Sequence, residues 1–300
     1  MAKSYTTLRN LFGAYTENTS SDNLTQGDQY INDGYRLILG NRAWPFLQKS
    51  DTVTTTASTQ FKEIPAGIER IRTVTVTVGS TIYTPTEITS ESEWQRINQV
   101  STTSDTPQYY FIRGKQVGLF PIPATTSNTI TLYGKREVKD LSIADYTTGT
   151  VVSVANGGVA VVGSGTTWTA AMAGRYLRIT ESDTANKGDG FWYEISSSGS
   201  STTITLVKPY EGTAISAGAA AYTIGQMPIL PEAYHVLPVY YAAAEYWDSK
   251  ADHQARATKY QMKYQQMLAQ MIKEFSSTSD NYVIEDLDTP MSNPNNYITL

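Results

Sequence analysis

The chain has no cysteine, two histidines and no long uninterrupted apolar run among its 300 residues. The absence of cysteine excludes disulfides, thiolate metal sites and thiol catalysis. Because His235 and His253 are separated from each other and from any dense carboxylate cluster, a zinc site is not expected. No stretch is long and apolar enough to cross a membrane, and the first residues lack the apolar segment of a signal peptide, so neither membrane insertion nor secretion is expected.

Positive charge is also scarce. The chain has 23 lysines and arginines against 28 aspartates and glutamates, which gives a net charge of −5. Tight binding to the outside of nucleic acid requires clustered basic residues, so the composition does not indicate a DNA- or RNA-binding protein of this kind. A hydrophobic content of 40% is nevertheless sufficient for at least one real core.

Motifs for catalysis or nucleotide binding are missing. No GxGxxG follows a predicted strand, no GxxxxGK[ST] occurs, and GSGTTW at 163–168 is typical of a turn. His235 is expected to be a satisfied core or interface residue, and His253 to lie in a solvated helix start. The carboxylates Glu181 and Asp183 could serve as the catalytic pair of a glycosidase, but their spacing alone says little, and acidic residues of this kind are common in surface loops. We therefore predict no catalytic residue, no metal ligand and no cofactor.

The first part of the chain, residues 1–145, combines helical and strand patterns. Helical periodicity near the N-terminus places four apolar residues on one stripe: Leu24, Ile31, Tyr35 and Ile38. Gly40 is expected to end this helix, and Pro45 to force a sharp corner at AWPFL.

The pattern then changes to a period of two. TVTTTASTQFKEI and RTVTVTVGSTIY predict half-buried antiparallel strands, with a turn at Gly79-Ser80. SESEWQRINQ predicts a short helix with Trp94 and Ile97 facing inward. YYFIRGKQVGLFPIP predicts a hairpin about Gly114-Lys115, and TITLYGKREV a further strand.

Residues 146–228 differ in composition from what precedes them. From 151 to 224 there are four basic and five acidic residues among Gly, Ser, Thr and Val: Arg175, Arg178, Lys187, Lys208, Glu181, Asp183, Asp189, Glu194 and Glu211. Short strand patterns separated by Gly and Ser turns indicate a small all-β sandwich or barrel. We expect an inserted β module, with the first fold resuming near residue 229.

Residues 229–275 predict two helices, with a break near Ser249 and Asp252. The second is amphipathic, because Tyr260, Tyr264, Leu268 and Met271 form one stripe. The first, within LPEAYHVLPVYYAAAEYWDSKAD, is apolar nearly all round. Such a helix must be enclosed by its own chain or by copies of itself. If by copies, the expected subunit interface is Tyr240, Tyr241, Ala243, Tyr246 and Trp247.

The last segment, residues 276–300, has no periodicity and contains two prolines, which predicts an extended arm. It is more apolar than a simple solvated end. We expect it to dock on a partner or neighbouring subunit through Tyr282, Val283, Ile284, Tyr297, Ile298 and Leu300.

The fold class is therefore α+β: a helical bundle from both chain ends, an antiparallel β-sheet domain, an inserted β module and a C-terminal arm. The order of helix, WPFL corner, hairpins, Trp-bearing helix, YYFIRGKQVGLFPIP and finally LPEAYHVLPVYYAAAEYW resembles the head–tail adaptor (connector) proteins of tailed bacteriophages. The likeness covers roughly 20–145 and 229–275. The inserted segment is similar to a β module that recurs in phage virion proteins.

The resemblance implies a structural virion protein at the head–tail junction, assembled in the host cytoplasm and not an enzyme. It implies a homo-oligomeric ring, usually of twelve copies, docked beneath the portal protein and followed by a downstream tail protein such as a nozzle, stopper or tail tube. Genomic DNA would pass through the lumen without tight binding, in agreement with the acidic balance. Whether the β module only thickens the ring or holds a tail fibre stays open.

Two other functions remain compatible with the residues. The first is a receptor- or glycan-binding virion protein, in which Trp168, Trp192 and Tyr193 of the β module would contact the ligand. The second is a hydrolase of cell-wall glycan, which would depend on a carboxylate such as Glu181 or Glu194.

Overall fold

The computed structural model of the chain describes residues 2–100, 102–181, 187–250 and 252–276. Within these ranges the protein has five α-helices and three largely antiparallel sheets, so the predicted α+β class is confirmed. The described residues form two compact units. One combines the chain up to Ala43 with the chain from Asp140 onward, and the other is Trp44–Lys139.

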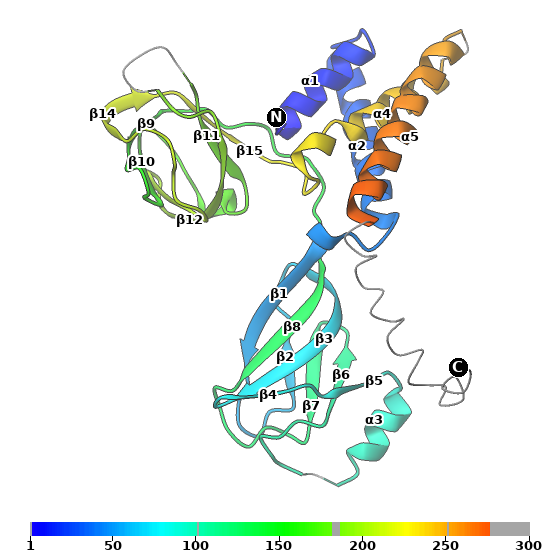
Figure 1. The fold of residues 1–300 in the computed structure, drawn as a ribbon, viewed down its shortest axis with the longest axis vertical. Coiled ribbons are helices and arrows are strands. Elements are labelled where there is room, and N and C mark those ends of the chain that lie inside the picture. Colours follow the sequence, from blue (N-terminus) through cyan, green and yellow to red (C-terminus); the bar gives the residue numbers. More distant parts are fainter. Residues whose placement is uncertain (1, 101, 182–186, 251, 277–300) are drawn as a thin grey trace, which may run out of the picture. The chain divides into compact units, whose positions relative to one another are not determined.

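Helices from both chain ends form one bundle, as predicted (Figure 1). Its members are α1 (Tyr5–Tyr15), α2 (Ser21–Gly40), α4 (Leu237–Asp248) and α5 (Gln254–Ser276). Ser4 and Ser20 cap the first two helices, each accepting a hydrogen bond at 3.4 Å from a main-chain N–H three residues later. Of the predicted stripe, Ile31, Tyr35 and Ile38 are buried and Leu24 is half-buried. The predicted break between the last two helices is confirmed.

The first of the two helices predicted for residues 229–275 begins later than residue 229. A 3-10 turn (η3, Glu232–Tyr234) precedes the helix, which begins only at Leu237. Pro238 then lies in the first helical turn, where its missing N–H costs no intrahelical hydrogen bond.

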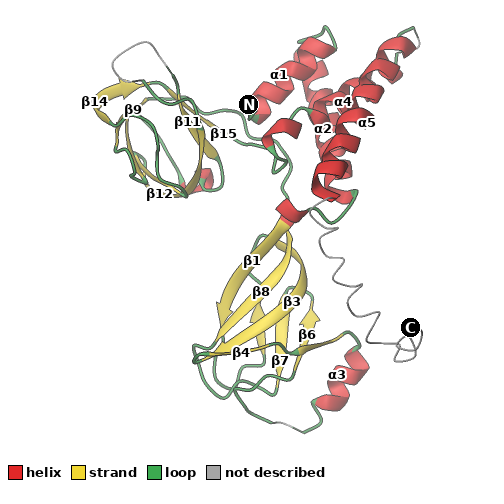
Figure 2. Ribbon diagram, in the orientation of Figure 1, coloured by secondary structure: helices red, strands yellow, loops and turns green. Residues whose placement is uncertain are grey.

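The unit Trp44–Lys139 is a β-sandwich (Figure 2). It begins with a 3-10 turn, η1 (Pro45–Leu47), and Trp44 is extended, as its place before a proline predicts. One sheet has the order β1-β8-β3-β4 and the other β2-β7-β6-β5. The strands are β1 (Gln48–Thr54), β2 (Phe61–Glu63), β3 (Ile68–Val78), β4 (Thr81–Tyr83), β5 (Thr86–Ile88), β6 (Tyr109–Arg113), β7 (Gln116–Phe120) and β8 (Thr129–Arg136).

Alternating side chains from both sheets fill the sandwich core. Val74 and Val76 of β3 are buried together with Val117 and Leu119 of β7. The hairpin about Gly114 is confirmed, with this glycine at φ 60°. Helix α3 (Glu91–Ile97) covers a separate hydrophobic cluster. Trp94 lies in this cluster and is 1% exposed, so the prediction that it faces inward is confirmed.

Residues 150–225 form a third sheet of seven strands with a core of its own. Its order is β14-β9-β10-β13-β12-β11-β15. The strands are β9 (Thr150–Val154), β10 (Ala160–Ser164), β11 (Tyr176–Ile179), β12 (Trp192–Ser200), β13 (Thr203–Leu206), β14 (Ile215–Ala220) and β15 (Tyr222–Gly225), with a 3-10 turn η2 (Ala170–Met172). The two edge strands, β14 and β15, are separated in sequence by Ala221 alone, so the sheet must curl until its edges approach each other.

Candidate assembly site

Helix α4 is enclosed largely by its own chain. It packs against α1, α2 and α5. Ala243 has no exposed surface, and Tyr246 and Trp247 are 8% and 6% exposed. The bundle therefore covers three of the five residues expected at a subunit interface, while Tyr240 and Tyr241 keep accessible surface.

Two glycines of α2 allow the neighbouring helices to come close. A Cβ atom on Gly27 would lie 2.3 Å from the ring of Phe12 in α1. A Cβ on Gly34 would lie 2.6 Å from Cδ1 and 2.9 Å from Cβ of Tyr241 in α4. Real Cβ atoms do not approach other carbons this closely, so both helix contacts require glycine.

Tyrosines cover one flank of α4. The ring of Tyr240 stacks on Tyr15 of α1 at 5.8 Å and on Tyr260 of α5 at 6.4 Å between centroids. Burial, followed by the neighbouring Tyr240, raises the pKa of Tyr15 to about 12. The Lys263 ammonium lies over Tyr240 and Tyr260, at 5.4 and 5.6 Å from their centroids. This flank therefore combines aromatic surface with positive charge.

The end of α4 is tied to α1 and α5 through Trp247. Its Nε1 donates to the main-chain oxygen of Tyr15 at 3.1 Å. The Arg256 guanidinium lies 4.6 Å from the Trp247 centroid and forms an ion pair with Glu17 at 2.9 Å. His253 is exposed to solvent, as expected, and one side of its ring packs edge-on against Trp247.

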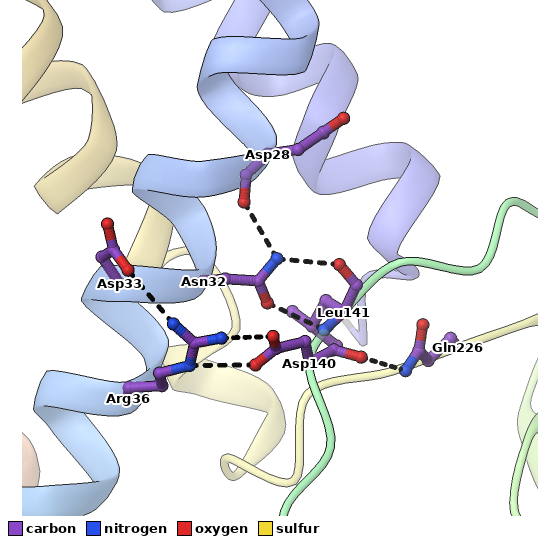
Figure 3. Close-up of polar contacts among 7 residues, drawn as sticks. All are labelled: Asp28, Asn32, Asp33, Arg36, Asp140, Leu141 and Gln226. Carbon is purple, nitrogen blue, oxygen red and sulfur yellow. Dashed lines mark hydrogen bonds and ion pairs between the residues drawn. The ribbon is translucent and has the colours of Figure 1, made fainter.

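A polar junction joins α2 to the chain segments that enter and leave the β9–β15 sheet (Figure 3). We define the polar junction as Asn32, Arg36, Asp140, Leu141 and Gln226. The Asn32 side chain donates to the Leu141 main-chain oxygen at 2.9 Å and accepts from the Leu141 N–H at 2.8 Å. Leu141 is 1% exposed, so Asn32 satisfies both main-chain groups of a buried residue.

The same junction holds the segment after Asp140 from its other side. Gln226 donates to the main-chain oxygen of Asp140 and accepts from the N–H groups of Ser142 and Ile143, all at 2.8 Å. Arg36 forms a bidentate ion pair with Asp140. Because Arg36 is 61% and Asp140 45% exposed, this pair contributes little energy, and the Asn32 and Gln226 hydrogen bonds fix the position.

The N-terminal segment is connected to the same region. Tyr5 donates its main-chain N–H to Gln226 O at 2.7 Å, and the Ser4 hydroxyl donates to Asp145 at 2.8 Å. His235 is 3% exposed. Its Nδ1 accepts from the Lys3 N–H at 3.0 Å and its Nε2 donates to Leu230 O at 2.8 Å, so the ring is neutral. Burial lowers its pKa. His235 is thus a satisfied core residue, as predicted.

Of the five residues named for the two rival functions, Trp168 and Tyr193 are buried in the core of the β9–β15 sheet, Trp192 and Glu194 are half-buried, and Glu181 is exposed. Trp168 is 2% exposed and donates from Nε1 to the Tyr222 hydroxyl at 2.9 Å. Tyr193 is 8% exposed, while Trp192 is half-buried beside Arg178. Trp168 and Tyr193 therefore have no free ring face for a sugar. Glu181 pairs with Lys187 at 2.9 Å on the surface.

No group of three His, Asp or Glu side chains within the described ranges could hold a metal ion. None of the helices in this part of the chain is long and apolar enough to span a membrane. The six apolar residues expected to dock on a partner, Tyr282, Val283, Ile284, Tyr297, Ile298 and Leu300, lie outside the described residues.

The polar junction was not predicted from the sequence. Asn32 and Leu141 are 109 positions apart, and Gln226 lies 86 positions from Asp140. None of these residues stands in a motif or periodic pattern. A polar Asn between the stripe residues Ile31 and Tyr35 was the one available signal, and it does not identify a partner.

A comparison with known families supports a specific assignment. A family model described as SU10 adaptor protein matches residues 3–185. The match includes α1, α2, the sandwich and the strands β9 to β11, so it extends beyond residue 145 into the third sheet. No curated protein matches the chain.

Proposed function

Because the chain belongs to the SU10 adaptor protein family, a family of phage structural adaptors, we propose that it forms a ring joining the capsid portal to the tail. The match over residues 3–185 carries this proposal. The ring would contain about twelve copies, the number that the resemblance to head–tail adaptors implies, and each subunit would meet its neighbour in the same way. We propose no catalytic role and no cofactor.

The portal protein would bind one end of the ring and a downstream tail protein, such as a nozzle, stopper or tail tube, the other. Genomic DNA would pass through the lumen. A net charge of −5 supports passage without tight binding, because few basic groups are present to displace counterions from the phosphates. The protein would be assembled in the host cytoplasm and remain at the head–tail junction of the virion.

Among the five helix residues considered for a subunit interface, Tyr240 and Tyr241 are the ones we retain. Both keep accessible surface at the flank of α4, whereas Ala243 is fully covered. We also propose that residues 276–300 dock on the portal or on an adjacent subunit. Their six apolar side chains, set in a polar, proline-containing sequence, support binding coupled to ordering of the segment.

We further propose that residues 146–228 are a self-contained module set into the adaptor chain, available as a site for tail fibres. The separate core of the β9–β15 sheet supports this. A chain in which a Gly/Ser linker replaces 148–226 should still unfold cooperatively when heated, with a lower Tm because it loses the Gln226 hydrogen bonds to Asp140, Ser142 and Ile143. Aggregation of that chain during expression, with the full chain soluble, would show that the module is integral to the fold.

Electron microscopy tests the main proposal. Negatively stained images of the purified chain, alone and mixed with its purified portal protein, should show rings with a central channel. In particles, the protein should lie between head and tail. A chain that stays monomeric both alone and with the portal would contradict the proposed ring.

A further inference from the structure

Two large hydrophobic side chains stand out on the helices. Leu37 of α2 and Met262 of α5 are each 52% exposed, and the other large hydrophobic residues in the described helices are buried or half-buried. Single exposed apolar residues are ordinary on a protein surface. These two differ from that background because their surroundings are complementary in shape and in charge.

Leu37 lies at a hollow on α2. The hollow is lined by Asp33, Arg36, Leu37, Gly40, Asn41 and Tyr241. Gly40 leaves it open on one side, since a Cβ there would meet nothing within 4 Å. Arg36 is already bound by both Asp33 and Asp140, so these three groups together carry one net negative charge, whereas Asp28 of the same helix is paired with Arg9. The hollow is therefore apolar inside with an acidic rim.

Met262 stands on a basic face of α5. Lys259 and Lys263 lie within one turn of it and are exposed. In the part of α5 from Gln254 to Lys273 there are four basic residues and no acidic one: Arg256, Lys259, Lys263 and Lys273. Lys259 and Lys263 lie over tyrosine rings, and no ion pair joins either to a carboxylate among the described residues. Arg256 is paired with Glu17, so Met262 is an apolar side chain that projects beside the positive charges of Lys259 and Lys263.

The two faces belong to the helices that flank α4. Tyr241 of α4 contacts Gly34 of α2 and also stacks edge-on with Tyr264 of α5, at 5.6 Å between centroids. Contact between two α5 faces would bring lysines together, and contact between two α2 faces would bring aspartates together. Both self-pairings are disfavoured, whereas α5 against α2 joins opposite charges.

We propose that α5 of one copy docks on α2 of the next, with Met262 in the hollow beside Leu37 and Lys259 or Lys263 facing Asp33. This inference rests on the proposed ring. It specifies a head-to-tail contact, in which each copy uses two different faces, and such contacts close into a ring when the rotation between copies allows it. The occupant of the hollow is thus a second copy of the chain.

The absence of cysteine makes a direct test possible. Leu37→Cys and Met262→Cys place single thiols on the two faces, and both positions are exposed, so folding should be retained. An equal mixture of the two variants, treated with a short bis-maleimide, should give a product of twice the 33.0 kDa chain mass. Each variant alone should stay monomeric on the gel. The double variant should give a ladder of products.

Ile82→Cys provides the matched control, since Ile82 is 67% exposed and belongs to the sandwich. Its mixture with Leu37→Cys should give no more crosslinked dimer than random collisions between exposed thiols produce.

Rings visible by microscopy without crosslinking between positions 37 and 262 would overturn the head-to-tail contact and leave the proposed function intact. Crosslinking of Met262→Cys to itself would also overturn it. Capture of Met262→Cys by Tyr282→Cys instead would assign the basic face to the acidic C-terminal arm, with the same consequence. A chain without rings, alone and with the portal, would contradict the proposed function itself.

Discussion

The contact between α2 and α4 predicts a marked effect for Gly34→Ala. In a helix interior, alanine is favoured over glycine by about 1 kcal/mol, so propensity alone predicts stabilisation. The new Cβ, however, would lie 2.6 Å from Cδ1 and 2.9 Å from both Cβ and Cγ of Tyr241. Carbon atoms prefer about 3.5–4.0 Å, and the Tyr241 Cβ cannot rotate away because the backbone holds it. The helices must therefore separate by about 1 Å.

Overpacking of this kind costs about 1–3 kcal/mol and also loosens the neighbouring contacts of Ala242 and Ala243. We expect a net loss of about 1–2 kcal/mol for Gly34→Ala, which corresponds to a fall of about 2–8 °C in Tm for a unit of this size. Thermal unfolding followed by far-UV circular dichroism measures it. Gly40→Ala is the control in the same helix, since no atom lies within 4 Å of its Cβ position, and it should be neutral or slightly stabilising. If Gly34→Ala were as stable as Gly40→Ala, the close approach of α2 and α4 would be refuted.

Asn32→Ala should lower the free energy of unfolding by about 1–3 kcal/mol, because it leaves the buried main-chain groups of Leu141 unpaired, while Gln29→Ala on the exposed face should change it by less than about 0.5 kcal/mol. Burial lowers the pKa of His235 below its ordinary 6.5, so its contribution to stability should be complete above that pH and be lost as the pH falls. His235→Gln should flatten this dependence in urea titrations. Truncation after Phe275 should leave Tm unchanged but weaken binding to purified portal protein about tenfold or more.

Each of these has a clear contrary result. Equal stability of Asn32→Ala and Gln29→Ala would show that the polar junction does not hold Leu141. A wild-type chain more stable in mild acid than at neutral pH would reverse the sign expected for a histidine that is buried and neutral. Undiminished portal binding by the truncated chain would remove residues 276–300 from docking.

Local patterns were sufficient for most of the secondary structure. The stripe of Ile31, Tyr35 and Ile38 predicts α2, and the alternation around Val74 and Val76 predicts β3, because burial on one side imposes the period of each element. The AWPFL corner and the hairpin about Gly114 were predictable for a different reason. Proline and glycine restrict or permit backbone angles regardless of the surroundings.

Contacts between distant segments were not predictable in the same way. Asn32, Leu141 and Gln226 meet only after α2 and the ends of the third sheet are in place. Polar side chains have no periodicity that would identify their partners. Tyr193 of β12 illustrates the same limit, since a strand pattern does not say which face of a sheet becomes core when the sheet curls.

Helix α4 shows which features the sequence determines and which depend on the tertiary structure. The sequence by itself established that this helix must be enclosed, because Val239, Ala243 and their neighbours leave it without a polar face. The tertiary structure alone decided that α1, α2 and α5 enclose most of it and that Tyr240 and Tyr241 remain accessible. The physical reason is that hydrophobicity requires removal from water without specifying a partner, and the partner is selected by shape at contacts such as Gly34 with Tyr241.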